Sequence, residues 1–183
     1  CATCHYAKGN HELEIGAVAF TEVCVNCHTA EGTTTLTTDN FKEVFVEEQA
    51  VPFKDAIALA LAKLSANYGI TYNSSAYPYF YDARNANSAV KDWTRGGQLT
   101  AAEAEKLMGA CFNINLLNRD PAAYVHARTY ARRLLYDTID FLDDKTINMS
   151  TGATAIAYDS VKYVKGTTAL DAATTEDFKY LAG

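Results

Sequence analysis

Cys1-Ala2-Thr3-Cys4-His5 and Cys24-Val25-Asn26-Cys27-His28 are the two stretches around which this chain is organised. Both follow the pattern Cys-x-x-Cys-His, and together they use four of the five cysteines. We call them the first and second pentads. Each puts two thiols three positions apart and an imidazole directly after the second thiol. That layout suits two thioether bonds to one porphyrin edge and an iron ligand beneath it.

The sequence therefore predicts two covalently attached haem c groups. Their thioether bonds are assigned to four residues: Cys1, Cys4, Cys24 and Cys27. A structural zinc site also uses pairs of cysteines, but it does not require a histidine directly after each pair. A thioredoxin-like redox motif would occur once, between a strand and a helix. Repetition of the full pentad favours haem over both alternatives.

Histidine usage extends the prediction to the iron ligands. Of four histidines, His5 and His28 lie in the pentads and His11 and His126 lie outside them. Two haems with a second imidazole each need two further histidines, so His11 and His126 are the expected distal ligands. The alternatives are Met ligation, since two methionines are present, or an open iron with the two histidines in ordinary roles.

Composition and charge limit the class of protein and its partners. The 183 residues are 49% hydrophobic and 21% charged, as in an ordinary globular protein of one or two domains. No run of about 20 apolar residues exists, so no membrane span is expected. The net charge is −6, which disfavours nucleic acid and anionic membranes as partners. A basic redox protein or a metal-bearing extracellular acceptor is a better match.

Covalent haem attachment predicts a periplasmic or extracellular location, with an export signal removed upstream. The chain starts at a cysteine that is assigned to haem, so that cysteine cannot also carry the lipid of a lipoprotein. Two origins stay open at this point. Cleavage falls directly before Cys1, or the chain is a trimmed part of a longer precursor.

The expected fold is mainly α, in three parts. Residues 1–40 form the haem-attachment segment, with a short helix within 12–23 and a threonine-rich linker or edge over 33–38. Residues 41–146 form a helical domain that supplies a distal haem ligand. Residues 147–183 form a C-terminal arm or hairpin, irregular or β-prone, because 155–158 and 161–164 are rich in β-formers.

Three helices are expected in the central part. The first starts near Pro52 and stops at Gly69. Residues 72–87 are aromatic without a clean period, which predicts a loop that covers the core or walls a haem edge. The second helix opens with a capping box at Thr100 and Glu103 and carries a buried Cys111. The third runs continuously over 122–142 and bears His126 near its start.

A longer set of residues resembles a known family. It comprises the two pentads and the later segments Gly109-Ala110-Cys111-Phe112-Asn113, Leu116-Leu117, Ala123-Tyr124-Val125-His126, Arg132-Arg133-Leu134-Leu135-Tyr136-Asp137 and Ile139-Asp140-Phe141-Leu142-Asp143. Over most of residues 1–145 these segments resemble the multihaem c-type cytochromes of dissimilatory metal-reducing bacteria. The resemblance implies an electron carrier with His126 as a distal ligand. The chain departs from the family in having two pentads where relatives commonly have more.

The expected function is electron transfer through two closely spaced, low-spin, bis-histidine haems, since 18 residues separate the pentads. The alternative is a dihaem redox enzyme, a peroxidase or oxyanion reductase, which needs one open iron and acid–base groups above it. A further expectation is self-association into a homo-oligomer or an extracellular filament, suggested by the 12 tyrosines and the terminal haem. For the distal ligands, we expect His11 to serve the haem of His28 and His126 the haem of His5.

Overall fold

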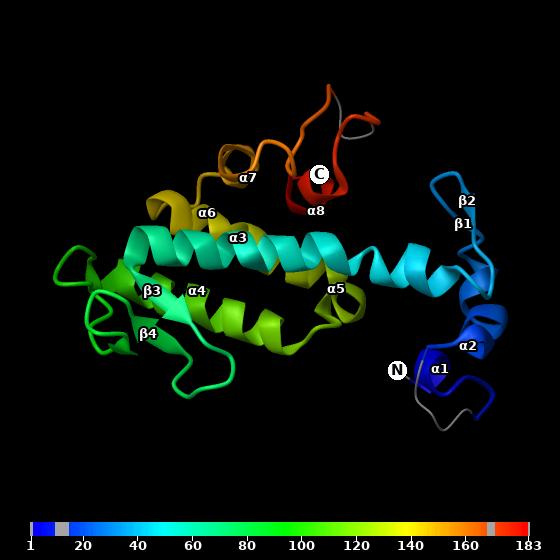
Figure 1. Ribbon diagram of the computed structural model, residues 1–183, viewed down its shortest axis with the longest axis horizontal. Coiled ribbons are helices and arrows are strands. Elements are labelled where there is room, and N and C mark those ends of the chain that lie inside the picture. Colours follow the sequence, from blue (N-terminus) through cyan, green and yellow to red (C-terminus); the bar gives the residue numbers. More distant parts are fainter. Residues whose placement is uncertain (1, 10–14, 168–170, 183) are drawn as a thin grey trace. The chain divides into compact units, whose positions relative to one another are not determined.

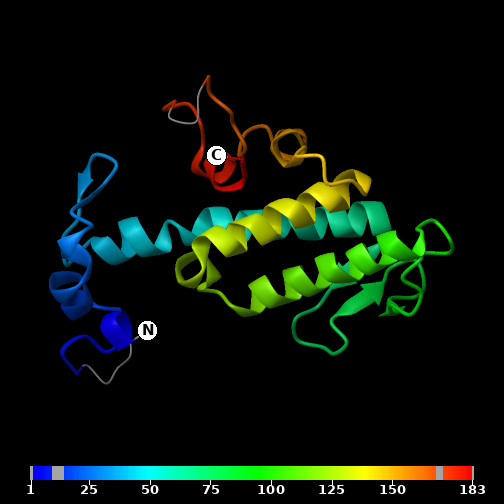
Figure 2. The ribbon, with the colours of Figure 1, turned by 180° about the vertical axis from the view of Figure 1, so that it is seen from behind.

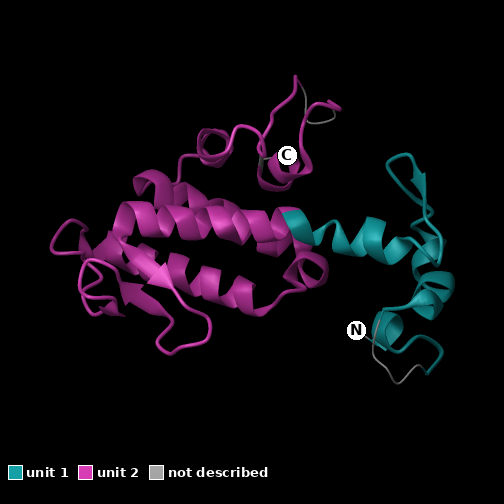
Figure 3. Ribbon diagram, in the orientation of Figure 1, with its two compact units in different colours: residues 1–51 teal, residues 52–183 magenta. Residues whose placement is uncertain are grey.

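The computed structural model of the chain describes residues 2–9, 15–167 and 171–182. Helices dominate, with a few short strands, so the predicted mainly α class is confirmed. The chain divides into two compact units, residues 1–51 and residues 52–183 (Figure 3). None of the helices in the described part of the chain has the length and apolar character that a membrane span requires.

Unit 1 consists of short elements. They are α1 (Ala2–His5), the 3-10 turn η1 (Ala7–Gly9), α2 (Ala17–Glu22), the 3-10 turn η2 (Cys24–Asn26), the antiparallel pair β1 (Ala30–Glu31) and β2 (Thr34–Thr35), and the π-helix η3 (Lys42–Glu47). The expected helix before the second pentad is therefore present as α2. Within the threonine-rich segment, β2 is exposed at both of its residues.

A small apolar core holds the second half of unit 1 together. Phe20 of α2, Leu36 and Phe41 are buried, and the Phe20 and Phe41 rings stack with their centroids 4.7 Å apart. Cys24 and Phe45 pack against these three side chains. The second pentad therefore lies directly on an apolar core, which is the surrounding that a porphyrin face requires.

Unit 2 contains the long helices. The elements that complete the chain are α3 (Ala50–Tyr68), β3 (Ile70–Tyr72), β4 (Phe80–Asp82), β5 (Ser88–Ala89), α4 (Ala101–Arg119), α5 (Ala123–His126), α6 (Arg128–Asp144), α7 (Thr151–Tyr158) and α8 (Glu176–Ala182). Helix α3 begins two residues before the boundary between the units.

The core of unit 2 lies among α3, α4 and α6, which run side by side in both views (Figure 1 and Figure 2). Leu64 of α3, Leu107 of α4 and Leu135 of α6 are fully buried in it. Cys111 is also buried, at 2% exposure, and burial raises the pKa of its thiol to about 12. This confirms the prediction that the fifth cysteine is a core residue rather than a nucleophile.

Both helix-end signals in the sequence are confirmed. Helix α3 stops at Tyr68, and Gly69 follows with φ +62°, a left-handed conformation that glycine adopts without strain. The Thr100 side chain accepts a hydrogen bond from the Glu103 N–H, and the Glu103 carboxylate accepts one from the Thr100 N–H. These reciprocal bonds start α4 at the residue after Thr100.

Residues 72–87 form a loop over most of their length, as predicted, but Tyr72 ends β3 and residues 80–82 form β4. They contribute to a three-stranded antiparallel sheet in the order β3-β4-β5, with Thr71 opposite Tyr81 and Tyr81 opposite Ala89. Each strand is two or three residues long. Such strands are too short to show an alternating pattern, so the sequence alone could not reveal them.

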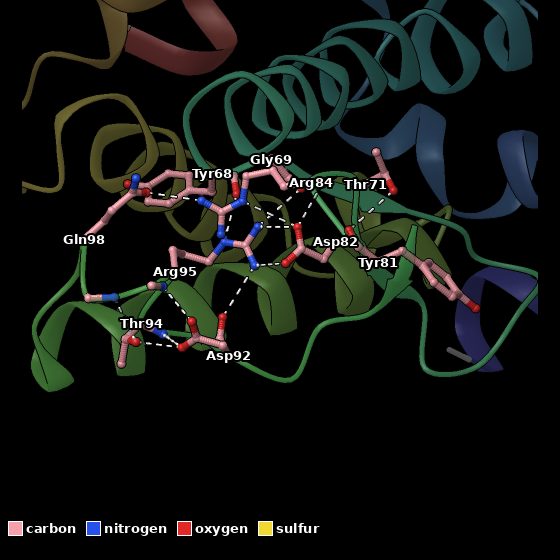
Figure 4. A network of polar contacts seen from close by, with 12 residues as sticks. Tyr68, Gly69, Thr71, Tyr81, Asp82, Arg84, Asp92, Thr94, Arg95 and Gln98 are labelled. Atoms are coloured by element: carbon pink, nitrogen blue, oxygen red, sulfur yellow. Dashed lines mark hydrogen bonds and ion pairs between the residues drawn. The ribbon is translucent and has the colours of Figure 1, made fainter. Parts of the chain in front are cut away.

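Hydrogen bonds from a buried arginine connect this sheet to the end of α3 (Figure 4). Arg95 is 2% exposed, and its Nη1 and Nη2 each donate to the Asp82 carboxylate at 2.8 Å. Its Nε donates to the Tyr68 carbonyl at 2.9 Å. The hydrogen bonds from Arg95 to the Asp82 carboxylate lower the pKa of Asp82 to about 2. This bidentate pairing of Arg95 with a carboxylate needs a planar guanidinium, which lysine does not have.

The continuous helix predicted over 122–142 is wrong. The structure has two helices there, α5 and α6, separated at Ala127 with φ −146° and ψ 46°. No glycine or proline lies at this break, so no local signal marks it. We attribute it to packing, because α5 buries Ala123 and α6 buries Ala131 against the same core.

The C-terminal part is more helical than the β-prone pieces predicted. Residues 155–158 form the second half of α7 instead of a strand. The carboxylate of Asp140, which is fully buried in α6, accepts hydrogen bonds from the N–H groups of Met149 (2.8 Å) and Ser150 (2.6 Å). This contact holds the start of α7. The β-propensity of residues 155–158 is a local property, so it could not predict a helix that depends on a contact with Asp140.

Candidate haem-attachment site

The second pentad forms a tight turn directly after α2. The backbone N–H groups of Cys27 and His28 both donate to the Cys24 carbonyl, at 3.1 and 2.8 Å. The Asn26 amide donates to the carbonyls of Glu22 (3.1 Å) and Val23 (3.2 Å), which ties the pentad to the end of the helix. One turn of backbone therefore carries the two cysteines and the histidine close together.

The donor chemistry at this turn fits a covalent haem. Cys24 and Cys27 are free thiols, half-buried and exposed respectively, and His28 is exposed. Attachment needs two reduced thiols that can reach one porphyrin edge and an imidazole with open space beside it. The thiols are free, the imidazole is exposed, and the apolar core of unit 1 adjoins Cys24.

The first pentad is seen in part, because Cys1 lies outside the described residues. Helix α1 includes Cys4 and His5, which are both half-buried, and Cys4 is a free thiol. The fold of this pentad resembles the second in being a short helical turn. His5 therefore directly follows its cysteine in a helical backbone.

The two pentads lie close together within unit 1. Lys8, in the turn after the first pentad, forms an ion pair with Glu22, at the end of the helix that leads into the second. Burial raises the pKa of the Cys24 thiol, and the nearby Cys4 thiol raises it further. These contacts place the two pentads near one another within unit 1.

His126 is the last residue of α5 and lies in unit 2. Its side chain is 52% exposed, and its Nδ1 lies 3.8 Å from the Asp120 carboxylate. Carboxylates often face one nitrogen of a metal-binding imidazole, which orients the ring and leaves the other nitrogen for the metal. The second predicted distal ligand, His11, lies outside the described residues, so its assignment stays a prediction.

Side chains that could ligate a metal are dispersed within residues 2–9, 15–167 and 171–182. No group of three or more His, Cys, Asp or Glu side chains is arranged there to hold a metal ion. The four cysteines in those ranges are free thiols rather than disulfides.

Comparison with known proteins agrees with this donor set. The chain is similar to polyhaem c-type cytochromes. It is 35% identical over 168 residues to the C-type polyheme cytochrome OmcC of Geobacter sulfurreducens, which covers 81% of this chain and 20% of the relative. It is 34% identical over 168 residues to OmcB from two strains of that species, with 81% of this chain and 21% of each relative covered.

These relatives are much longer than the chain. It spans about a fifth of the length of the curated relatives it matches. No family model matches the chain. No solved structure matches it either.

Sequence reasoning missed two features of the site. One is the contact between the His28 and Phe45 rings, whose centroids lie 4.3 Å apart. The other is the carboxylate of Asp120 beside His126. The second had a local signal, since the two residues lie six positions apart near a helix start. The first had none, because 17 positions separate the rings along the chain.

Proposed function

We propose that this chain is an electron-carrying part of a multihaem c-type cytochrome and that it holds two covalently attached haem c groups. The observation that carries the proposal is the second pentad, where two free thiols and an imidazole share one tight turn against an apolar core. Similarity to polyhaem c-type cytochromes supports it independently. Bound haem supplies one-electron chemistry at its iron, so the chain itself needs no reactive side chain.

Each side chain of the site has a specific part in this proposal. Cys1 and Cys4 anchor one haem and Cys24 and Cys27 the other, while His5 and His28 are the proximal ligands. His11 and His126 are the proposed distal ligands, with His11 on the haem of His28. Because all four histidines are then used as ligands, we propose an electron carrier rather than a peroxidase or oxyanion reductase.

For location and assembly, we propose an exported protein, periplasmic or extracellular, that associates with itself and with other redox proteins. Covalent haem attachment supports the location. The support for self-association is an apolar stripe on α4, where Met108, Phe112 and Leu116 follow one another at intervals of four residues and are 48%, 64% and 43% exposed. Side chains four apart lie on one helix face, so this face offers a continuous apolar surface.

The proposal is tested by counting haems. We expect the intact mass of the exported protein to exceed that of its polypeptide by two haems after full denaturation, because thioether bonds survive unfolding. The alkaline pyridine spectrum should give the same stoichiometry. A mass that corresponds to one haem, or to none, would contradict the proposal.

The distal role of His126 has its own test. In His126→Met we expect the reduction potential of one haem to rise by on the order of 0.1 V and the other to change little, since an axial Met raises the potential. A redox titration followed in the visible spectrum measures both values. The matched control is Thr129→Met, which adds a thioether at an exposed position three residues further on. Equal potentials in the wild type and His126→Met would show that His126 is not a ligand.

A further inference from the structure

The imidazole of His28 has an aromatic neighbour from a distant part of unit 1. The Phe45 ring lies with its centroid 4.3 Å from that of His28 and with the two planes inclined by 38°. His28 is exposed to solvent, and its side chain projects from a short turn. The Phe45 ring therefore covers one face of an imidazole that would otherwise have water on it.

Phe45 is itself held firmly. It is half-buried and packs against the core formed by Phe20, Leu36 and Phe41. It belongs to η3, a π-helix whose wider turn is closed by a hydrogen bond of 2.9 Å from the Glu48 N–H to the Glu43 carbonyl. Turns of this kind are rare and occur frequently at functional sites.

The wider turn has a local consequence for packing. Val44, Phe45 and Val46, three consecutive residues, all pack against the same core. In an α-helix, three consecutive side chains spread over more than half of the circumference, because each turn holds 3.6 residues. The π-helical backbone thus keeps Phe45 on the core while its ring reaches His28.

We propose that Phe45 is a positioning residue for His28, which sets the rotation of this imidazole in its role as an axial ligand of the second haem. The inference rests on the haem assignment proposed above. Without the contact, an exposed imidazole on a short turn would rotate about its side-chain bonds. Neighbours that hold a metal-bound imidazole control its orientation and the strength of its bond to the metal.

The test compares two phenylalanine variants of the haem-loaded, full-length chain. Phe45→Leu keeps an apolar side chain on the core but removes the ring beside His28. Phe41→Leu is the matched control, because Phe41 belongs to the same core and stacks on Phe20 rather than on His28. Phe45→Tyr restores a ring at position 45. Haem content by intact mass is measured first for every variant.

We expect Phe45→Leu to shift the largest g value of one low-spin haem signal in the electron paramagnetic resonance spectrum and to leave the other signal unchanged. The reduction potential of that haem should also change, because the bond from a less firmly held His28 to the iron is weaker. Phe45→Tyr should restore both values. Phe41→Leu should lower the unfolding temperature without either of these changes.

Two results would overturn the inference, and they differ in what else they affect. If both haems are attached and Phe45→Leu has the g values and reduction potentials of the wild type, Phe45 does not position His28 and the haem assignment stands. The same holds if Phe41→Leu gives an equal shift, since the effect then comes from loss of the core. If the wild type carries no haem, the proposed function and the inference fail together.

Discussion

Replacing Cys24 and Cys27 together with alanine is expected to remove one haem and to leave the other attached. Both thioether bonds of the second site come from these residues in our assignment, so no covalent bond remains there. The two side chains are small, and Cys24 is half-buried at the edge of the unit 1 core, so alanine fits in both places. The intact mass after denaturation should therefore fall by one haem relative to the wild type.

The fifth cysteine provides the matched control. Cys111 is buried in α4, and burial raises the pKa of its thiol to about 12, so it is neither reactive nor accessible. We expect Cys111→Ala to keep both haems. Loss of a haem in Cys111→Ala, or two haems in the double variant, would show that the thiols have been assigned to the wrong bonds.

Arg95→Met is expected to lower the free energy of unfolding of unit 2 by about 2–3 kcal/mol, the range for loss of hydrogen bonds to a charged group. The substitution leaves the Asp82 carboxylate and the Tyr68 carbonyl without a donor that both have at under 3 Å in the wild type. The loss is limited because the Asp82 carboxylate is 15% exposed and still accepts a hydrogen bond from the Arg84 N–H at 3.0 Å. Urea unfolding followed by circular dichroism at pH 7 measures the difference.

The control for this variant is a second arginine at the same carboxylate. Arg84 lies 3.5 Å from the Asp82 Oδ1 but is 42% exposed. Exposed ion pairs contribute roughly 0–1 kcal/mol, so Arg84→Met should have a much smaller effect. Equal losses in the two variants would indicate that the Arg95 pairing does not anchor the sheet.

The same pair predicts how stability depends on pH. The Arg95 hydrogen bonds lower the pKa of Asp82 from 3.8 to about 2 in the folded chain. A carboxylate with a lowered folded pKa binds fewer protons than it does unfolded, so its contribution is complete above about pH 4 and is lost as the pH falls towards 2. The gap between the wild type and Arg95→Met should therefore narrow between these two pH values.

The haem assignment could be made from the sequence because all its information is local. A pentad carries two thiols and an imidazole within five residues, and any helical turn brings them together. The end of α3 at Gly69 and the start of α4 at Thr100 were predictable for the same reason, since each depends on a few neighbouring residues. The buried positions of the long helices were also predictable, because apolar residues recur about every 3.6 positions along the sequence of such a helix.

Contacts between distant residues could not be predicted in this way. Arg95 pairs with Asp82 at the end of the strand over 80–82. The break at Ala127 comes from the packing of the two flanking helices, and the start of α7 is held by hydrogen bonds to the buried Asp140. At the site, Phe45 meets His28 because the π-helix and the pentad fold onto one apolar core. The sequence by itself determined which residues we propose to bind haem. Only the tertiary structure decided which side chains hold those residues in place, because that depends on contacts between elements far apart along the chain.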